Sequence, residues 1–76
     1  MMALHAEIRK VNEDNQFVRY AYTDAGGAEQ TVLLNKTAET ISLESGAENM
    51  LYRAVARKIA SAWLSGSAPE RMTVQS

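Results

Sequence analysis

The segment from Ser45 to Gly66 constrains the fold most, because it is the only long stretch of the chain with a helical pattern. At about 100° per residue, its larger apolar side chains project within an arc of roughly 120°. These side chains are Leu51, Tyr52, Val55, Ile59, Ala62 and Trp63. Arg53 and Arg57 project the other way. We therefore predict one amphipathic helix that covers a single apolar surface made by the rest of the chain.

Both ends of this segment carry signals for a helix terminus. Ser45 is a favoured N-cap residue, and Glu48 stands three positions later, which together give the pattern of a capping box. Gly66 can adopt the left-handed backbone conformation that ends many helices, and Pro69 follows it. The sequence therefore predicts that the helix begins directly after Ser45 and ends just before Gly66.

Three extended segments precede the helix. Residues 2–11 alternate between apolar and polar side chains, which is typical of a half-buried strand. Residues 17–23 and 29–35 are rich in aromatic and β-branched residues, which favour strands. Turn-forming residues fill the two gaps, at 12–15 and 24–27. The pattern predicts an antiparallel meander of three strands.

Turn geometry predicts the register of the two hairpins. We expect a three-residue loop with Gly27 in a bulge for the second hairpin and a three-residue turn for the first. These registers place apolar residues opposite one another on one face: Tyr20 with Val32, Val18 with Leu34, Ile8 with Tyr20, and Ala6 with Tyr22. The first register also sets Arg9 opposite Arg19 on the other face. Because the two hairpins agree, we expect Tyr20 and Tyr22 to lie under the helix.

Two segments leave the strand count open. Within residues 36–43, Thr40 to Leu43 alternates and could form a fourth strand that leads into the helix. Residues 70–75 could add a short C-terminal strand through Met72 and Val74. The predicted fold is a single small α+β domain over residues 1–76, with two layers. It consists of an antiparallel β-meander of three or four strands, one long amphipathic helix and, in one alternative, a short last strand.

Composition excludes several classes of protein. The net charge of -1 arises from interspersed acidic and basic residues, so no overall field attracts nucleic acid or an anionic membrane. The absence of cysteine excludes disulfides and thiolate chemistry. No apolar run approaches the roughly 18 residues of a membrane span, and residues 1–10 lack the apolar core of a secretory signal. We expect a cytoplasmic protein that makes no contact with a membrane.

No motif for catalysis or metal binding stands out. His5 is the only histidine, and its pairing with Glu7 on one strand face is typical of a solvated surface. A structural zinc site would need three or four ligands at characteristic spacings. Glu13 and Asp14 lack the spacing of a calcium loop, and Gly26-Gly27 lacks the lysine and hydroxyl residue of a phosphate-binding loop. We therefore expect no enzymatic activity, no cofactor and no bound metal.

Two functions of different classes fit what is left. The first is a protein-interaction or assembly module that self-associates as a homodimer or joins a larger complex, since a chain of this size has a modest core. Its candidate contact residues are Val11, Phe17, Arg19, Met50, Arg53, Arg57 and Leu64. The alternative is a nucleic-acid-binding domain that uses strand aromatics and arginines. Residues 17–20 match the last four positions of a signature of RNA-recognition motifs, although the preceding glycine is missing.

Overall fold

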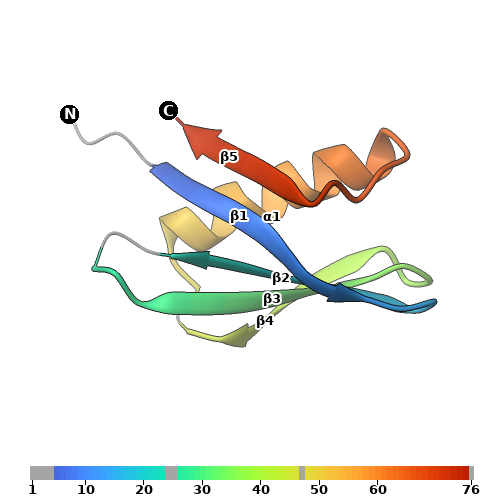
Figure 1. Cartoon of the computed structure of the whole chain (residues 1–76), viewed down its shortest axis with the longest axis horizontal. Helices are drawn as coiled ribbons and strands as arrows, with labels where there is room; N and C mark the ends of the chain where they lie inside the picture. Colours follow the sequence, from blue (N-terminus) through green and yellow to red (C-terminus); the bar gives the residue numbers. More distant parts are fainter. Residues whose placement is uncertain (1–4, 24–25, 47, 76) are drawn as a thin grey trace.

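The computed structural model describes residues 5–23, 26–46 and 48–75, and shows one antiparallel sheet with a helix packed on one face (Figure 1). The elements are β1 (His5–Glu13), β2 (Phe17–Thr23), β3 (Glu29–Asn35), β4 (Thr40–Ser45), α1 (Met50–Leu64) and β5 (Arg71–Gln75). The predicted two-layer α+β fold is confirmed, and both segments left open form strands. Within the part of the chain that the structure describes, no helix combines the length and apolar character needed to cross a membrane.

The strand order in the sheet is β4-β3-β2-β1-β5. The first four strands form the predicted meander, and α1 then carries the chain across the sheet from β4 at one edge to β5 at the other. β5 pairs antiparallel with β1, with Val74 opposite Ala6 and Met72 opposite Ile8. The described N-terminal and C-terminal strands therefore lie side by side, and β4 and β5 form the two edges of the sheet (Figure 1).

The core lies between α1 and the sheet face that carries the inward side chains. Its largest fully buried residues are Tyr20, Tyr22, Ile8, Leu34, Ile59, Val18, Val32 and Val55. The two tyrosine hydroxyls have partners: that of Tyr20 donates to the carbonyl of Pro69 at 2.8 Å, and that of Tyr22 donates to Oε1 of Gln30 at 3.0 Å. Burial raises the pKa of Tyr20 to about 12. Trp63 packs against this core but stays only half-buried.

The register of the second hairpin is confirmed, since Tyr20 lies opposite Val32. The predicted register of the first hairpin is wrong by two residues, because Ile8 lies opposite Tyr22 and Lys10 opposite Tyr20. The turn lies later in the chain than predicted, since the N–H of Asp14 donates to the carbonyl of Phe17 at 2.9 Å. The pairing of β1 also shifts between Lys10 and Asn12. A shift of two residues keeps every side chain on its face, so the predicted core face is still correct. The shift places Arg9 opposite Ala21 instead of the predicted Arg19. On the other side of β1, Arg9 lies opposite Arg71 of β5, a pairing of like charges that the sequence did not predict.

The predicted capping box at Ser45 is wrong. Ser45 is the last residue of β4, and its hydroxyl lies 3.1 Å from that of Thr31 in β3. The helix begins at Met50, and its N-cap is Asn49, whose side-chain oxygen accepts a hydrogen bond from the backbone N–H of Tyr52 at 2.9 Å. Ser45 therefore pairs as part of β4 and does not cap the helix. Asn49, four residues later, is the N-cap.

The predicted end of the helix is confirmed. Gly66 has a φ of 97°, in the left-handed region that favours glycine. Its N–H donates to the carbonyl of Trp63 at 2.9 Å, and the N–H of Ser67 donates to the carbonyl of Ala62 at 3.1 Å. These two bonds form a Schellman motif, which satisfies carbonyls at the end of α1.

Candidate functional site

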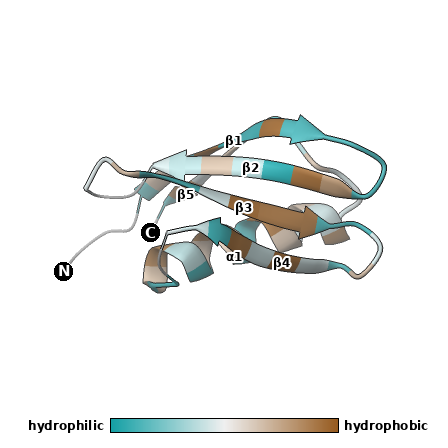
Figure 2. Ribbon diagram, turned by 90° about the horizontal axis from the view of Figure 1, so that it is seen from below, coloured by the Kyte–Doolittle hydropathy of each residue, from teal (hydrophilic) through white to brown (hydrophobic). Residues whose placement is uncertain are grey.

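Two large apolar side chains lie close together on the sheet face that points away from α1. Phe17 opens β2, and Leu33 lies in β3, where it pairs with Arg19. The side chains of Phe17 and Leu33 are therefore diagonal neighbours on one face, and each is half-buried. Figure 2 shows apolar residues of β2 and β3 gathering toward the end of the sheet that carries the β1–β2 turn. This end of the outer face is the best candidate for a contact site.

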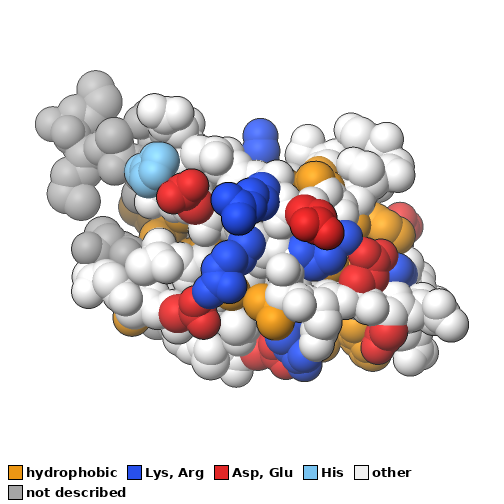
Figure 3. All heavy atoms as spheres, viewed as in Figure 1, with side chains coloured by type: hydrophobic (Ala, Val, Ile, Leu, Met, Phe, Trp, Pro, Cys, Tyr) orange, Lys and Arg blue, Asp and Glu red, His pale blue; other side chains and the backbone are white. Residues whose placement is uncertain are grey.

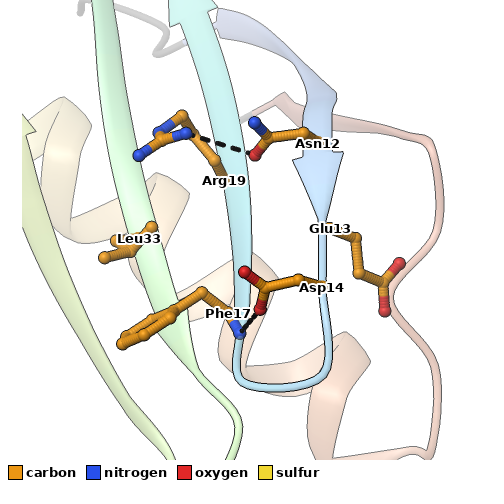
Figure 4. Close-up of a pocket in the computed structure, with 6 residues that line it drawn as sticks. All are labelled: Asn12, Glu13, Asp14, Phe17, Arg19 and Leu33. Atoms are coloured by element: carbon orange, nitrogen blue, oxygen red, sulfur yellow. Dashed lines mark hydrogen bonds between the residues drawn. The ribbon is translucent and has the colours of Figure 1, made fainter.

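These two side chains line a shallow hollow of about 310 Å³, and Figure 4 shows its lining residues. We call it the outer hollow, and its residues are Asn12, Glu13, Asp14, Phe17, Arg19 and Leu33. The sequence predicted Phe17 and Arg19 as contact residues but missed the other four. Leu33 could have been found, because it is a large apolar residue at a position where the alternation of β3 calls for an outward side chain.

The rim of the outer hollow is held by Asp14 in the β1–β2 turn. One carboxylate oxygen of Asp14 accepts hydrogen bonds from the backbone N–H groups of Gln16 at 2.8 Å and Phe17 at 2.7 Å. These backbone hydrogen bonds, from Gln16 first and then Phe17, lower the pKa of Asp14. The turn therefore fixes the backbone at Phe17 and positions its ring at the start of β2.

Arg19 forms the polar side of the outer hollow. Its guanidinium donates to both carboxylate oxygens of Glu44 in β4, at 2.7 and 3.1 Å, and to the side chain of Asn12 at 3.3 Å (Figure 4 shows the bond to Asn12). The hydrogen bonds with Glu44 raise the pKa of Arg19, and those with Arg19 lower the pKa of Glu44. This ion pair spans β3, so it joins β2 to β4 and neutralises the charge of Arg19 on the outer face.

The rest of the outer face repeats this mixture of charges. Arg9 of β1 forms an ion pair with Glu29 of β3 across β2. Ala21 of β2 lies between these strands and is buried, although its side chain is on the outer face. Figure 3 views the molecule from the sheet side and shows acidic and basic side chains next to one another. The outer face therefore carries paired charges of both signs around the apolar Phe17 and Leu33.

Glu13 links the β1–β2 turn to the connection between β3 and β4. Its two carboxylate oxygens accept from the ammonium groups of Lys10 and Lys36, each at 2.6 Å. The hydrogen bond from Lys10, followed by that from Lys36, lowers the pKa of Glu13 from 4.5 to about 2. Lys36 also donates to the backbone carbonyl of Asp14 at 2.7 Å, so the same lysine holds the turn beside the outer hollow.

We expect acid to weaken this link in a defined pH window. A carboxyl whose pKa is lower in the folded chain stabilises the fold above its unfolded value and loses that contribution as pH falls. For Glu13 the loss should run from pH 4.5 down to about pH 2. Glu13→Gln should lower the urea midpoint at pH 6, and the difference from the wild type should shrink through this window. Glu39→Gln is the control for loss of one charge, and an equal effect of both variants would contradict the prediction.

The structure does not bring the seven predicted contact residues together. Phe17 and Arg19 share the outer hollow, whereas Met50, Arg53 and Arg57 line a different hollow on α1. Val11 is 48% exposed and lies where the pairing of β1 shifts, while Met50 and Leu64, which are 73% and 77% exposed, lie at opposite ends of α1. The two helix arginines, Arg53 and Arg57, line a separate hollow of about 240 Å³ with Met50 and Ala54.

The charged side chains that line the outer hollow are engaged within the chain. The carboxylates of Glu13 and Asp14 are held by the hydrogen bonds described above, and Arg19 is held by Glu44. His5 is exposed in β1, opposite Gln75 of β5. Among residues 5–23, 26–46 and 48–75, no group of three or more His, Cys, Asp or Glu side chains is placed to hold a metal ion.

No family model, curated protein or solved structure matches this chain.

Proposed function

We propose that this protein is a small interaction module that self-associates, with two copies meeting through the outer faces of their sheets at the outer hollow. The observation that carries the proposal is the pair of half-buried apolar side chains, Phe17 and Leu33, on the face that α1 leaves uncovered. Large aromatic residues with a neighbouring arginine are common anchors of protein interfaces. Phe17 would be the anchor, and Arg19 would be its polar neighbour.

The charges of the outer face support a second copy of the chain as the partner. In a two-fold dimer, the same surface patch contacts itself, so a face of one sign would repel its copy. Here two arginines on the face have carboxylate partners: Arg9 pairs with Glu29, and Arg19 pairs with Glu44. A copy rotated by 180° could therefore place its acidic groups near basic groups of the first. Nucleic acid has less support, because its phosphates would compete with these carboxylates for the same arginines.

Sedimentation equilibrium tests the proposal. The wild type should form a dimer at micromolar concentration, and Phe17→Glu should sediment as a monomer with an unchanged helical circular dichroism signal. Met50→Glu is the matched control, since it places the same charge at an exposed apolar residue on α1 and should leave the dimer intact. If Phe17→Glu unfolds the chain, Leu33→Ser takes its place and should also yield a monomer. A wild type that remains monomeric at high micromolar concentration would overturn self-association.

A further inference from the structure

A second surface lies at the opposite side of the molecule from β4, where α1 runs beside β5. A groove of about 370 Å³ lies there, lined by Ala54, Arg57, Lys58 and Ser61 of α1 and by Thr73, Val74 and Gln75 of β5. We call it the edge groove. β5 pairs with β1 on one side, and no residue of β1 lines the groove. The edge groove therefore opens along the free edge of β5.

The backbone along this edge is suited to pairing with another strand. An antiparallel ladder uses the N–H and C=O groups of alternate residues for one neighbour and turns the others away. The N–H of Lys10 donates to the carbonyl of Glu70 at 2.7 Å, and the regular register with β1 continues from Arg71 to Gln75. By this alternation, Arg71, Thr73 and Gln75 turn their backbone groups toward the free edge. Such an edge is a template for an added strand.

The helix side of the edge groove is positively charged. The residues of α1 include Arg53, Arg57 and Lys58 but no aspartate or glutamate. All three cations are exposed, and none forms an ion pair within the described parts of the chain. The cations that do form ion pairs lie on or beside the sheet. α1 thus carries a local excess of positive charge in a chain whose net charge is -1.

We propose that the edge groove binds an extended acidic peptide, which adds to β5 as a strand and places carboxylates beside Arg57 and Lys58. The main chain of the peptide would pair with the free edge of β5, and every second side chain would point into the groove. The small side chains of Ala54 and Ser61 leave room for these inward residues, and Val74 offers an apolar contact. The peptide would therefore carry acidic and small apolar residues at alternate inward positions.

Two other occupants fit the edge groove less well. A second copy paired edge to edge through β5 would bring Arg57 and Lys58 of the two copies toward one another, and like charges across an interface are unfavourable. A nucleic acid would match the positive charge of α1. It has no strand backbone with which to satisfy the N–H and C=O groups along β5, so the combination of charge and free edge favours a peptide.

Fluorescence anisotropy with the full chain tests this binding. The probe is a labelled nine-residue peptide whose inward positions alternate between glutamate and valine and whose outward positions are threonine. We expect Arg57→Glu to weaken its binding about tenfold or more, and Arg53→Glu, which makes the same charge change outside the groove lining, to weaken it less than about threefold. A probe with glutamine in place of glutamate should bind as weakly as the glutamate probe binds to Arg57→Glu. Equal losses for the two arginine variants would overturn the proposal.

Two further probes separate strand addition from simple charge attraction. Methylation of the backbone nitrogens at alternate positions should abolish binding for one set of positions and leave it intact for the other, because only one set faces β5. Equal binding of the two methylated probes would overturn strand addition. A single-stranded oligonucleotide should compete poorly, and an oligonucleotide that binds more tightly than the peptide would also overturn the proposal. Phe17→Glu should bind the peptide as the wild type does, so this result is independent of self-association.

Discussion

Gly46→Ala should destabilise the fold by about 3 kcal/mol or more, the sum of backbone strain and a disturbed buried polar contact. Gly46 has a φ of 113°, a conformation that residues with a side chain rarely adopt. A Cβ atom there would lie 2.2 Å from Oε1 and 2.5 Å from Cδ of Gln30. Gln30 cannot move aside easily, because it is 5% exposed and its Oε1 accepts the hydroxyl of Tyr22. The new methyl group would therefore push a buried amide away from its partner.

Gly27→Ala is the matched control for this prediction. Gly27 also has a positive φ, of 86°, but no atom lies within 4 Å of the position that its Cβ would occupy. Its replacement should therefore cost only the backbone strain, about 1–2 kcal/mol. Urea denaturation followed by circular dichroism measures both changes in the free energy of unfolding. Equal losses for the two variants would show that Gln30 adjusts without cost and would contradict the proposed clash.

Ile59→Ala should cost about 2–5 kcal/mol, the range for truncating a large aliphatic side chain in a core. Ile59 is 1% exposed and is among the largest fully buried side chains. It lies on the face of α1 that packs against the sheet, so its removal leaves a cavity between the two layers. A domain of 76 residues has a total stability of about 4–11 kcal/mol at the usual range per residue. This single change should therefore remove a large part of it.

Leu64→Ala tests whether the loss at Ile59 comes from burial. Leu64 belongs to the same helix but is 77% exposed, so its truncation should change the free energy of unfolding by no more than about 0.5 kcal/mol. Thermal and urea denaturation of the two variants give the comparison. Alanine is a better helix former than either residue, so helix propensity cannot cause a loss at either position. A similar loss at both positions would therefore contradict the assignment of the loss at Ile59 to burial.

Local patterns in the sequence determined the elements of this fold and the face on which each side chain lies. Alternation identified the strands, and it placed Tyr20 and Tyr22 under α1 even though the predicted register of the first hairpin was wrong. The side-chain period of a strand is two, so a shift of two residues preserves the face. Helical periodicity identified the buried stripe of α1, and Gly66 identified its end, because these signals depend only on neighbours within a few residues.

The candidate site was only partly visible in the sequence. Phe17 and Arg19 could be predicted, because both lie at outward positions of a recognisable strand. Leu33 could also have been predicted as the diagonal neighbour of Phe17, because the predicted register of β2 and β3 is correct. The partner of Arg19 could not, because its bond to Glu44 joins residues 25 positions apart and spans β3. Because that carboxylate neutralises Arg19, it changes the charge that the outer face would present to a partner. No pattern among neighbouring residues in the sequence predicts this pairing.

Only the tertiary structure decided the helix start, the strand order and the edge groove. Ser45 could cap a helix or extend β4, and pairing with β3 beside Thr31 settled the choice. A short segment such as β5 can join either edge of a sheet, and the length and path of α1 bring it to β1, far from it in sequence. Local sequence reports the preferences of a few neighbouring residues. Pairing between distant strands depends on the packing of the whole chain, so the surface between α1 and the free edge of β5 exists only once the fold is complete.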